Sequence, residues 1–311
     1  MTIDVKVIAH SWAKETMREL ATLEVRYPRF IHAEMMTHRV FSRNASSSRA
    51  IPTKRMHDTV RQDLALPERW VMNEPGMQGY VEASPDLVRQ AEAIMSAASQ
   101  SAIRYAEQLD KLGFHKQHVN RITEPYQHIR TVWTSSQWNN FFILRTDPTA
   151  EPTMQVLASK VRDAVLGTEP RTLQRGEWHL PYVDSGDLEY LDYVANQYRE
   201  SSELATYADW FPPHAGTRGL FRFLTIAVSA ARCARVSYNN FEGKVSTLDE
   251  DIELFKKLIV SHPVHASPVE HQATPDYRYN ITDKWVNPNR HGNLIGWQQA
   301  RKFVPGENGD A

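Results

Sequence analysis

The chain has 311 residues and a formal net charge of −1, which gives no electrostatic basis for general nucleic-acid binding and leaves room only for a local basic site. Hydrophobic residues make up 41% and charged residues 23% of the sequence, as in an ordinary globular protein. A single cysteine, Cys233, excludes an intrachain disulfide and fits a reducing, cytoplasmic location. The N-terminal apolar runs contain charged residues, so we expect no signal peptide, and no apolar run reaches the roughly 18 residues of a membrane span.

Two strands and a short helix are predicted at the N-terminal end of the chain. Residues 3–8 alternate between apolar and polar side chains, and residues 22–30 carry a second strand signal that Pro28 should end. Residues 29–41 have the pattern of a short helix. Residues 53–83 are interrupted by proline and glycine, so we expect a loop there.

A long helix is predicted at residues 84–112. Ser84 and Pro85 form a start signal, because a serine side chain can cap free backbone N–H groups and proline fits the first helical turn. Gly113 is of the residue type that commonly ends a helix. Apolar side chains at helical spacing predict further helices at residues 125–145, 153–166, 187–204, 222–237 and 248–262.

The stretch at residues 37–49, which reads THRVFSRNASSSR, crowds cations and short polar side chains together. Its arginines offer planar donors that suit phosphate oxygens, and its small serines let a ligand approach the backbone closely. The same serines are ordinary turn residues, so a turn without a ligand is an alternative. The glycine pattern of a Walker loop is absent from the sequence. The functional hypothesis for this stretch is an anion site of another kind.

Two other segments could contribute to a site. Residues 261–271, SHPVHASPVEH, contain three histidines and one glutamate. A zinc site, structural histidines and a cofactor site are all open for this segment, although its prolines break the helical spacing of a metal-binding helix. In residues 139–148, NNFFILRTDP, Arg145 could stabilise the carbonyl end of a helix, pair with Asp147, or point into a site.

Together these segments resemble the flavin-dependent thymidylate synthase (ThyX) family. The first matches that family's signature, Arg-His-Arg-x-x-Ser-x-Asn-x-x-Ser-x-Arg, everywhere except at the leading arginine. NNFFILRTDPTAE is similar to the family's Asn-x-x-x-x-Arg-x-Asp segment. ARVSY at residues 234–238 and HASPVEH at residues 265–271 are similar to a pair of segments that the family carries before its signature. Here the pair follows the signature, so the resemblance implies a circularly permuted chain.

The resemblance implies an α+β fold in which helices pack on an antiparallel sheet. We expect one ThyX-like catalytic domain over residues 1–311, circularly permuted. Within it, residues 1–165 would hold the signature and a helical part, residues 166–225 an insert or linker, and residues 226–311 the permuted segment.

The resemblance also implies roles for individual residues. Arg145 would be catalytic and substrate-binding, because it would orient the pyrimidine beside the flavin, and His265 would be catalytic at the flavin and folate face. The residues expected to bind the FAD cofactor are His38, Arg39, Asn44, Asn140, Ser237 and Ser267. The residues expected to bind the phosphate and sugar of the nucleotide substrate are Ser47, Ser48, Arg49 and Arg121. No metal ligand is expected.

The implied reaction transfers a one-carbon unit from methylenetetrahydrofolate to C5 of dUMP, with NADPH reducing FAD. The family forms its sites where subunits of a homotetramer meet, so we expect a homotetramer that binds a nucleotide and neither nucleic acid nor membrane. Arg145 would stabilise negative charge on the pyrimidine, so no protein nucleophile is needed. Cys233 lies in an alanine-rich helical pattern, and we expect a core residue there and not a reactive thiolate.

Four positions depart from the family's pattern. Glu34, Thr37, Ala45 and Thr149 stand where the family has glutamine, arginine, an acidic residue and histidine. Several of these positions contact the nucleotide in the family, so the same scaffold could act on dCMP or make a hydroxymethyl pyrimidine nucleotide. A non-enzymatic protein that binds nucleotides or nucleic acid is a second alternative.

Overall fold

The computed structural model describes residues 3–197, 203–211, 219–238, 246–279 and 282–307. At the centre of this part of the chain is a five-stranded sheet in the order β3-β4-β2-β1-β5, in which β1 and β5 pair in parallel and the other neighbours are antiparallel. The fold is therefore α+β with a mostly antiparallel sheet, as predicted. The strands are β1 Asp4–Ala13, β2 Arg18–Pro28, β3 Ser42–Ala45, β4 His128–Ser135 and β5 Arg171–Leu173, with β6 Ala273–Pro275 and β7 Trp297–Gln299 in a separate antiparallel pair.

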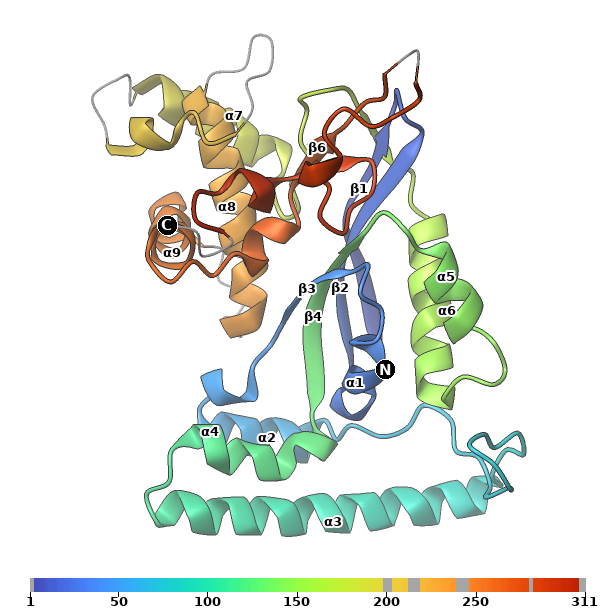
Figure 1. The fold of residues 1–311 in the computed structure, drawn as a ribbon. Coiled ribbons are helices and arrows are strands. Elements are labelled where there is room, and N and C mark those ends of the chain that lie inside the picture. The colour runs from blue at the N-terminus through green and yellow to red at the C-terminus, as the bar shows by residue number, and fades with distance from the viewer. Residues whose placement is uncertain (1–2, 198–202, 212–218, 239–245, 280–281, 308–311) are drawn as a thin grey trace.

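Helices surround the central sheet. In Figure 1, α5 and α6 lie along one side of it, α7, α8 and α9 form a group on the other side, and α3 lies across one end beyond α2 and α4. The helices are α1 His32–Met35, α2 Thr53–Gln62, α3 Pro85–Lys111, α4 Lys116–Val119, α5 Asn139–Arg145, α6 Pro152–Leu166, α7 Ser185–Gln197, α8 Gly219–Tyr238 and α9 Leu248–Phe255. None of the helices in the described ranges combines the length and apolar composition needed to cross a lipid bilayer.

Consecutive residues of β4 show that α6 and α8 pack on opposite faces of the sheet. Val132 and Trp133 point to opposite sides, because side chains alternate along a strand. Trp133 lies in a buried core with Leu157 of α6, whereas Val132 packs against Cys233 and Val236 of α8. The sheet is thus buried between a first layer that contains α5 and α6 and a second layer that contains α8. Cys233 is fully buried in this second layer, which confirms its prediction as a core residue.

A buried ion-pair network joins the C-terminal helices to one another. Phe223 of α8 packs edge-on against Phe255 of α9, with ring centroids 5.5 Å apart. Beside this contact, the fully buried carboxylate of Asp251 accepts hydrogen bonds from Arg232 Nε at 3.1 Å and from Arg235 Nε at 2.8 Å. Both arginines lie on α8 and Asp251 lies on α9, so the carboxylate fixes one helix against the other.

Several predicted elements are confirmed. Strands β1 and β2 form where the two N-terminal strands were expected, and Pro28 ends β2. The predicted long helix is α3, where Ser84 Oγ accepts a hydrogen bond from the backbone N–H of Leu87 at 3.4 Å. The predictions for residues 153–166 and 222–237 correspond to α6 and α8.

The predicted helix at residues 125–145 is wrong in its first half. Residues His128–Ser135 form strand β4, which pairs with β2 on one side and β3 on the other, and only Asn139–Arg145 are helical, as α5. The strand is rich in β-branched and aromatic residues, which favour strands. The strand has only three apolar residues, Ile129, Val132 and Trp133, so the apolar side chains that indicate α5 do not extend a helical pattern into it.

Other element boundaries also differ from prediction. A helix, α2, lies inside the loop expected at residues 53–83. The helix expected at residues 29–41 is limited to a 3-10 turn and α1, after which the chain turns into β3. The helix expected at residues 248–262 is α-helical to Phe255 and then continues as a π-helical turn. Of the helix expected at residues 187–204, α7 ends at Gln197 and residues 198–202 lie outside the described ranges.

Candidate functional site

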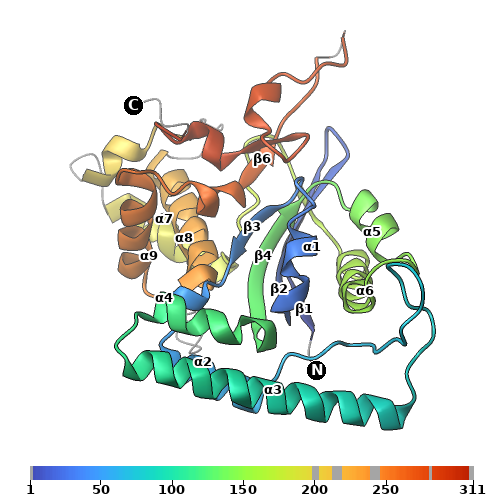
Figure 2. The ribbon, with the colours of Figure 1, turned by 60° about the horizontal axis from the view of Figure 1, so that its bottom comes forward.

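Strand β3 brings three distant segments of the chain together. It carries part of the donor-rich stretch and lies at the edge of the central sheet, paired with β4 from Ser42–Thr134 to Ala45–Thr131. Just beyond β3, the backbone N–H of Ser47 donates to the carbonyl oxygen of Ser237 at the end of α8, at 3.1 Å. The 3-10 turn at residues 267–270, in the histidine-rich segment, also packs against β3. Figures 1 and 2 both show α8 beside β3.

Arg145 of α5 and His38, in the segment that leads into β3, form a first cluster. Arg145 Nε donates to His38 Nε2 at 2.8 Å, and Arg145 Nη2 donates to Thr37 Oγ1 at 3.0 Å. Arg145 Nη1 lies 3.4 Å from Glu34 Oε2. The His38 ring packs edge-on against Phe141, with centroids 5.0 Å apart. We call Glu34, Thr37, His38 and Arg145 the Arg145 cluster.

His38 accepts the hydrogen bond from Arg145 as a neutral imidazole. Burial, with the nearby cations Arg145 and Arg43, lowers the pKa of His38 to about 4. Burial also raises the pKa of Glu34, an effect that the neighbouring Glu151 reinforces and Arg145 opposes. Arg145 therefore bonds to a neutral imidazole, with a partly exposed carboxylate at longer range. Arg145 and Glu34 form an ion pair at 3.4 Å, and the Glu34 side chain is 37% exposed, so solvent weakens this compensation of the Arg145 charge.

Arg43 connects this cluster to the C-terminal part of the chain. Its Nη1 donates to the carbonyl oxygens of Met35 and His38, at 3.1 and 3.2 Å. Burial lowers the pKa of Arg43, and the charge of Glu270 opposes that shift. Glu270 in turn forms an ion pair with Arg301. Arg43 was one of three arginines noted in the donor-rich stretch, but the resemblance gave it no role.

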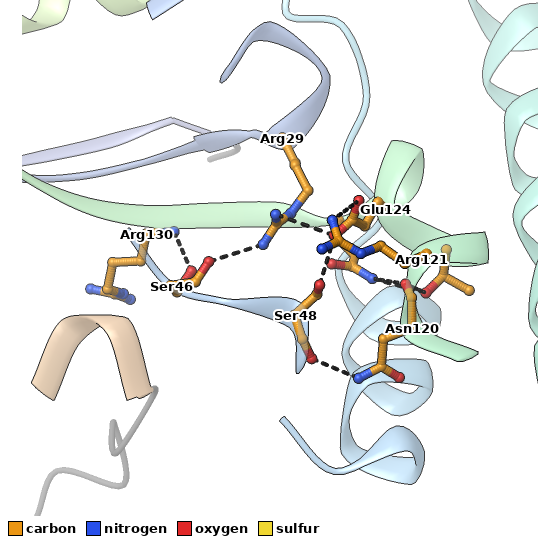
Figure 3. Close-up of polar contacts among 9 residues, drawn as sticks. Arg29, Ser46, Ser48, Asn120, Arg121, Glu124 and Arg130 are labelled. Carbon is orange, nitrogen blue, oxygen red and sulfur yellow. Dashed lines mark hydrogen bonds and ion pairs between the residues drawn. The ribbon is translucent and has the colours of Figure 1, made fainter. Parts of the chain in front are cut away.

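After β3, Glu124 is the centre of a second cluster (Figure 3). Its Oε1 accepts hydrogen bonds from Ser48 Oγ at 2.6 Å and from Arg121 Nη1 at 3.2 Å. Arg29 Nη1 reaches the same oxygen at 3.5 Å, and Arg29 Nη2 donates to the carbonyl oxygen of Ser46 at 3.1 Å. We call Arg29, Ser48, Arg121 and Glu124 the Glu124 cluster.

Local backbone contacts hold the Glu124 cluster in place. Asn120 Nδ2 donates to the carbonyl oxygens of Ser48 and Ile51, at 2.7 and 2.9 Å. These bonds fix the donor-rich stretch against the 3-10 helix Asn120–Tyr126, which carries Arg121 and Glu124. Sequence reasoning included Ser48 and Arg121 but missed Glu124 and Arg29. The i, i+3 spacing of Arg121 and Glu124 is a readable pairing signal, but no sequence signal links Arg29 to them.

The other predicted residues lie around β3 without forming a common cluster. Asn44 is buried on β3, and its Nδ2 has no hydrogen-bond partner among the described residues. Arg39, Arg49, Asn140, His265 and Ser267 are exposed, as is Arg121 of the Glu124 cluster. Asn140 lies on α5, in the helical layer opposite α8. The structure therefore brings Arg145 to His38, Ser47 to Ser237, and Ser48 to Arg121.

The three histidines of the segment 261–271 do not face one point. His271 is fully buried, its Nδ1 lies 2.8 Å from Thr134 Oγ1 in the sheet, and burial lowers its pKa to about 3. His262 and His265 are exposed. In the part of the chain that the structure describes, no group of three His, Cys, Asp or Glu side chains is arranged to hold a metal ion.

A cavity of about 430 Å³ lies away from both clusters, between α7 and α9. Tyr190, Tyr193 and Lys256 are among its lining residues. None of the predicted site residues lines it.

No protein-family profile and no curated protein matches the chain. A solved structure of a UMP/dUMP methylase PolB from Streptomyces cacaoi bound with 5-Br UMP has a TM-score of 0.44 at 16% identity, over 52% of this chain and 87% of the methylase. A second structure of that enzyme, with 5-Br dUMP, gives 0.43 at 16% identity, over 52% and 89% of the two chains. Thymidylate Synthase X (ThyX) from Helicobacter pylori with FAD and dUMP gives 0.33 at 17% identity, over 48% and 68%.

Proposed function

We propose that this chain is a pyrimidine-nucleotide-modifying enzyme of the ThyX type, which uses FAD and NADPH to transfer a one-carbon unit from methylenetetrahydrofolate to C5 of dUMP. The observation that carries this proposal is the convergence at β3. The hydrogen bond from Ser47 to Ser237 joins two segments that resemble the family but lie far apart in the sequence. The turn at residues 267–270, from the third such segment, packs on the same strand. Circular permutation remains the proposed explanation of their order.

The residues around β3 suit a dinucleotide such as FAD in their chemistry. The buried Nδ2 of Asn44 is a donor without a partner among the described residues, which is costly unless a ligand accepts from it. Arg39, Arg49 and Ser267 are exposed donors that could reach phosphate oxygens. When bound, FAD would supply the hydride-transfer chemistry. Exposed donors in the segments around the edge strand β3 also fit the proposed homotetramer, in which a second copy would complete the site.

Each cluster is proposed to hold one end of the nucleotide. Ser48, Arg49 and Arg121 would bind the phosphate, and Arg145 would lie against the pyrimidine ring. Arg145 donates to the neutral His38 and pairs with the partly exposed Glu34, and its guanidinium could stabilise negative charge developing on the ring as C5 becomes nucleophilic. Cys233 is unsuited to attack C6, since it is fully buried and burial raises its pKa.

Release of tritium from C5 of the substrate tests the proposal. Purified protein would be incubated with dUMP tritiated at C5, methylenetetrahydrofolate and NADPH, and the visible absorbance of a bound flavin would be recorded on the same sample. We expect a yellow protein, or one that becomes yellow with added FAD, and tritium release that needs the folate. A colourless protein that takes up no FAD and releases no tritium would favour the non-enzymatic alternative.

Action on dCMP is a second candidate, and Glu34 is the observation that favours it. Its carboxylate lies 3.4 Å from Arg145 Nη1, where the pyrimidine would be bound. A carboxylate accepts a hydrogen bond from the 4-amino group of cytosine, whereas the 4-oxo group of uracil has no proton to donate. Tritiated dCMP, run beside tritiated dUMP, would separate the two substrates by their rates of tritium release. Product chromatography would distinguish a methyl from a hydroxymethyl product.

A further inference from the structure

The donors of the Glu124 cluster converge on one carboxylate oxygen. Ser48 Oγ, Arg121 Nη1 and Arg29 Nη1 all reach Oε1 of Glu124, at 2.6, 3.2 and 3.5 Å (Figure 3). A hydroxyl and two guanidinium groups around one anionic oxygen are also the arrangement by which proteins hold a phosphate oxygen. Arg121 Nη1 also lies 3.3 Å from the second carboxylate oxygen, Oε2, so a phosphate that used these same N–H and O–H groups would compete with the Glu124 carboxylate for them.

The charges of the cluster do not balance. Arg29 and Arg121 each carry a positive charge and Glu124 carries one negative charge, so the described cluster has an excess of one positive charge. The Arg29 side chain is only 16% exposed, and burial lowers its pKa, an effect that Glu124 opposes and Arg121 reinforces. A phosphate monoester dianion would match two arginines better than one carboxylate does.

The cluster is open to solvent at Arg121. The Arg121 side chain is 62% exposed and that of Glu124 is 22% exposed. Exposed ion pairs contribute little to the free energy of folding, so stabilisation of the fold alone does not account for an arginine at this position. An incoming anion could approach from the exposed side, where Arg121 and Glu124 meet.

We propose that Glu124 is an internal competitor for the nucleotide phosphate: it occupies the donors Arg29, Ser48 and Arg121 in the free protein, and the phosphate monoester displaces it. Arg29 then becomes a phosphate ligand that the sequence resemblance did not include. This inference rests on the proposed function in one respect, the assignment of this cluster to the phosphate of a nucleoside monophosphate. Competition of this kind weakens nucleotide binding. When no nucleotide is present, the carboxylate of Glu124 gives the buried guanidinium of Arg29 a counter-charge.

Replacing Glu124 with glutamine tests the competition directly. Glu124→Gln keeps the size of the side chain and an oxygen that can accept from Ser48, but it removes the competing charge. We expect the dissociation constants of dUMP and of inorganic phosphate, measured by calorimetry on the full chain, to fall by about tenfold or more. Phosphate should also raise the melting temperature of this variant more than that of the wild type. Glu82→Gln, which removes a carboxylate paired with the exposed Arg69, is the matched control and should leave both affinities unchanged.

Other outcomes would overturn the inference. Unchanged or weaker binding of dUMP and phosphate by folded Glu124→Gln would show that Glu124 is only a structural partner of the arginines. Tighter binding of FAD without tighter binding of dUMP would assign the cluster to the dinucleotide instead. Should Glu124→Gln fail to fold, Arg121→Ala at an exposed position takes its place, and unchanged dUMP affinity in that variant would equally reject the proposal.

The phosphate measurement separates this inference from the proposed reaction. Inorganic phosphate binding requires no flavin, folate or pyrimidine. Tighter phosphate binding by Glu124→Gln in a protein that releases no tritium would support the inference and reject the reaction. If the wild-type protein releases tritium and Glu124→Gln changes neither affinity, the reaction is supported and the inference is rejected.

Discussion

The two arginine clusters on either side of β3 differ in what their arginine is bonded to. Arg145 donates to a neutral imidazole and pairs with the carboxylate of Glu34 at 3.4 Å, where the Glu34 side chain is 37% exposed. Arg121 shares a carboxylate with Arg29 and Ser48, so its charge is already engaged by Glu124. Arg145 and Glu34 thus pair one to one, whereas Arg29 and Arg121 share a single carboxylate that is 22% exposed. Substitutions at the two clusters should affect different steps, catalysis at the first and nucleotide binding at the second.

Loss of Arg145 should have the largest effect on the proposed reaction. Arg145→Ala removes the cation that would stabilise charge on the pyrimidine, so we expect tritium release to fall by about 10² to 10³-fold. FAD binding should weaken less in Arg145→Ala than in His38→Ala. Tritium release and flavin absorbance would be measured on the same samples.

Arg104→Ala on α3 is the control for Arg145→Ala, because Arg104 is an exposed arginine whose recorded partner is the nearby Ser101. It should keep the wild-type rate. A full rate in folded Arg145→Ala would reject the role assigned to the first cluster and remove the contrast with Arg121.

The pH dependence of the free energy of unfolding should show the second-largest difference between the two clusters. A histidine whose pKa falls from 6.5 to about 4 on folding binds its proton more readily in the unfolded chain. The free energy of unfolding therefore decreases as the pH falls from 6.5 towards 4, and His38→Gln should reduce that slope by up to about 1.4 kcal/mol per pH unit. Arg145 and Arg43 stay charged throughout, and Glu34, with its raised pKa, acts in the opposite direction near its own titration. Urea unfolding between about pH 5 and about pH 6.5 is the measurement.

The Glu124 cluster contains no histidine, so Arg121→Ala should keep the wild-type slope over the same range. Other buried histidines with lowered pKa, such as His179 and His271, contribute equally in all three proteins and cancel in the comparison. Equal slopes for wild type and His38→Gln would mean that His38 is not held neutral by the fold.

Cys233→Ser should have the smallest effect on activity. Cys233 lies in the layer between α8 and the sheet and contacts neither cluster in the proposed mechanism. We expect tritium release close to the wild-type rate and a loss of about 1–3 kcal/mol in the free energy of unfolding, because a hydroxyl would replace a buried thiol. A folded variant without activity would restore the thiolate mechanism and make the contrast between the arginine clusters irrelevant to catalysis.

Local signals predicted part of this fold and site, and long-range contacts decided the rest. Ser84 and Pro85 were sufficient to locate the start of α3, because capping depends on neighbouring residues. Residues 128–135 contain only three apolar residues, Ile129, Val132 and Trp133, and pairing with β2 and β3 is what defines them as a strand. Neighbouring residues cannot predict the contact of Arg29 with Glu124, since the two are 95 positions apart.

The shared carboxylate of Asp251 has a consequence for how mutations in the ARVSY segment should be understood. Arg235 belongs to that segment, yet its guanidinium is anchored in the neighbouring helix and is not presented to a ligand. Two residues further on, Ser237 meets the donor-rich stretch. Arg235 thus helps to fix the C-terminal end of α8, and the position of Ser237 depends on that anchoring. A substitution of Arg235 would therefore be expected to affect the proposed ligand site indirectly, by displacing Ser237.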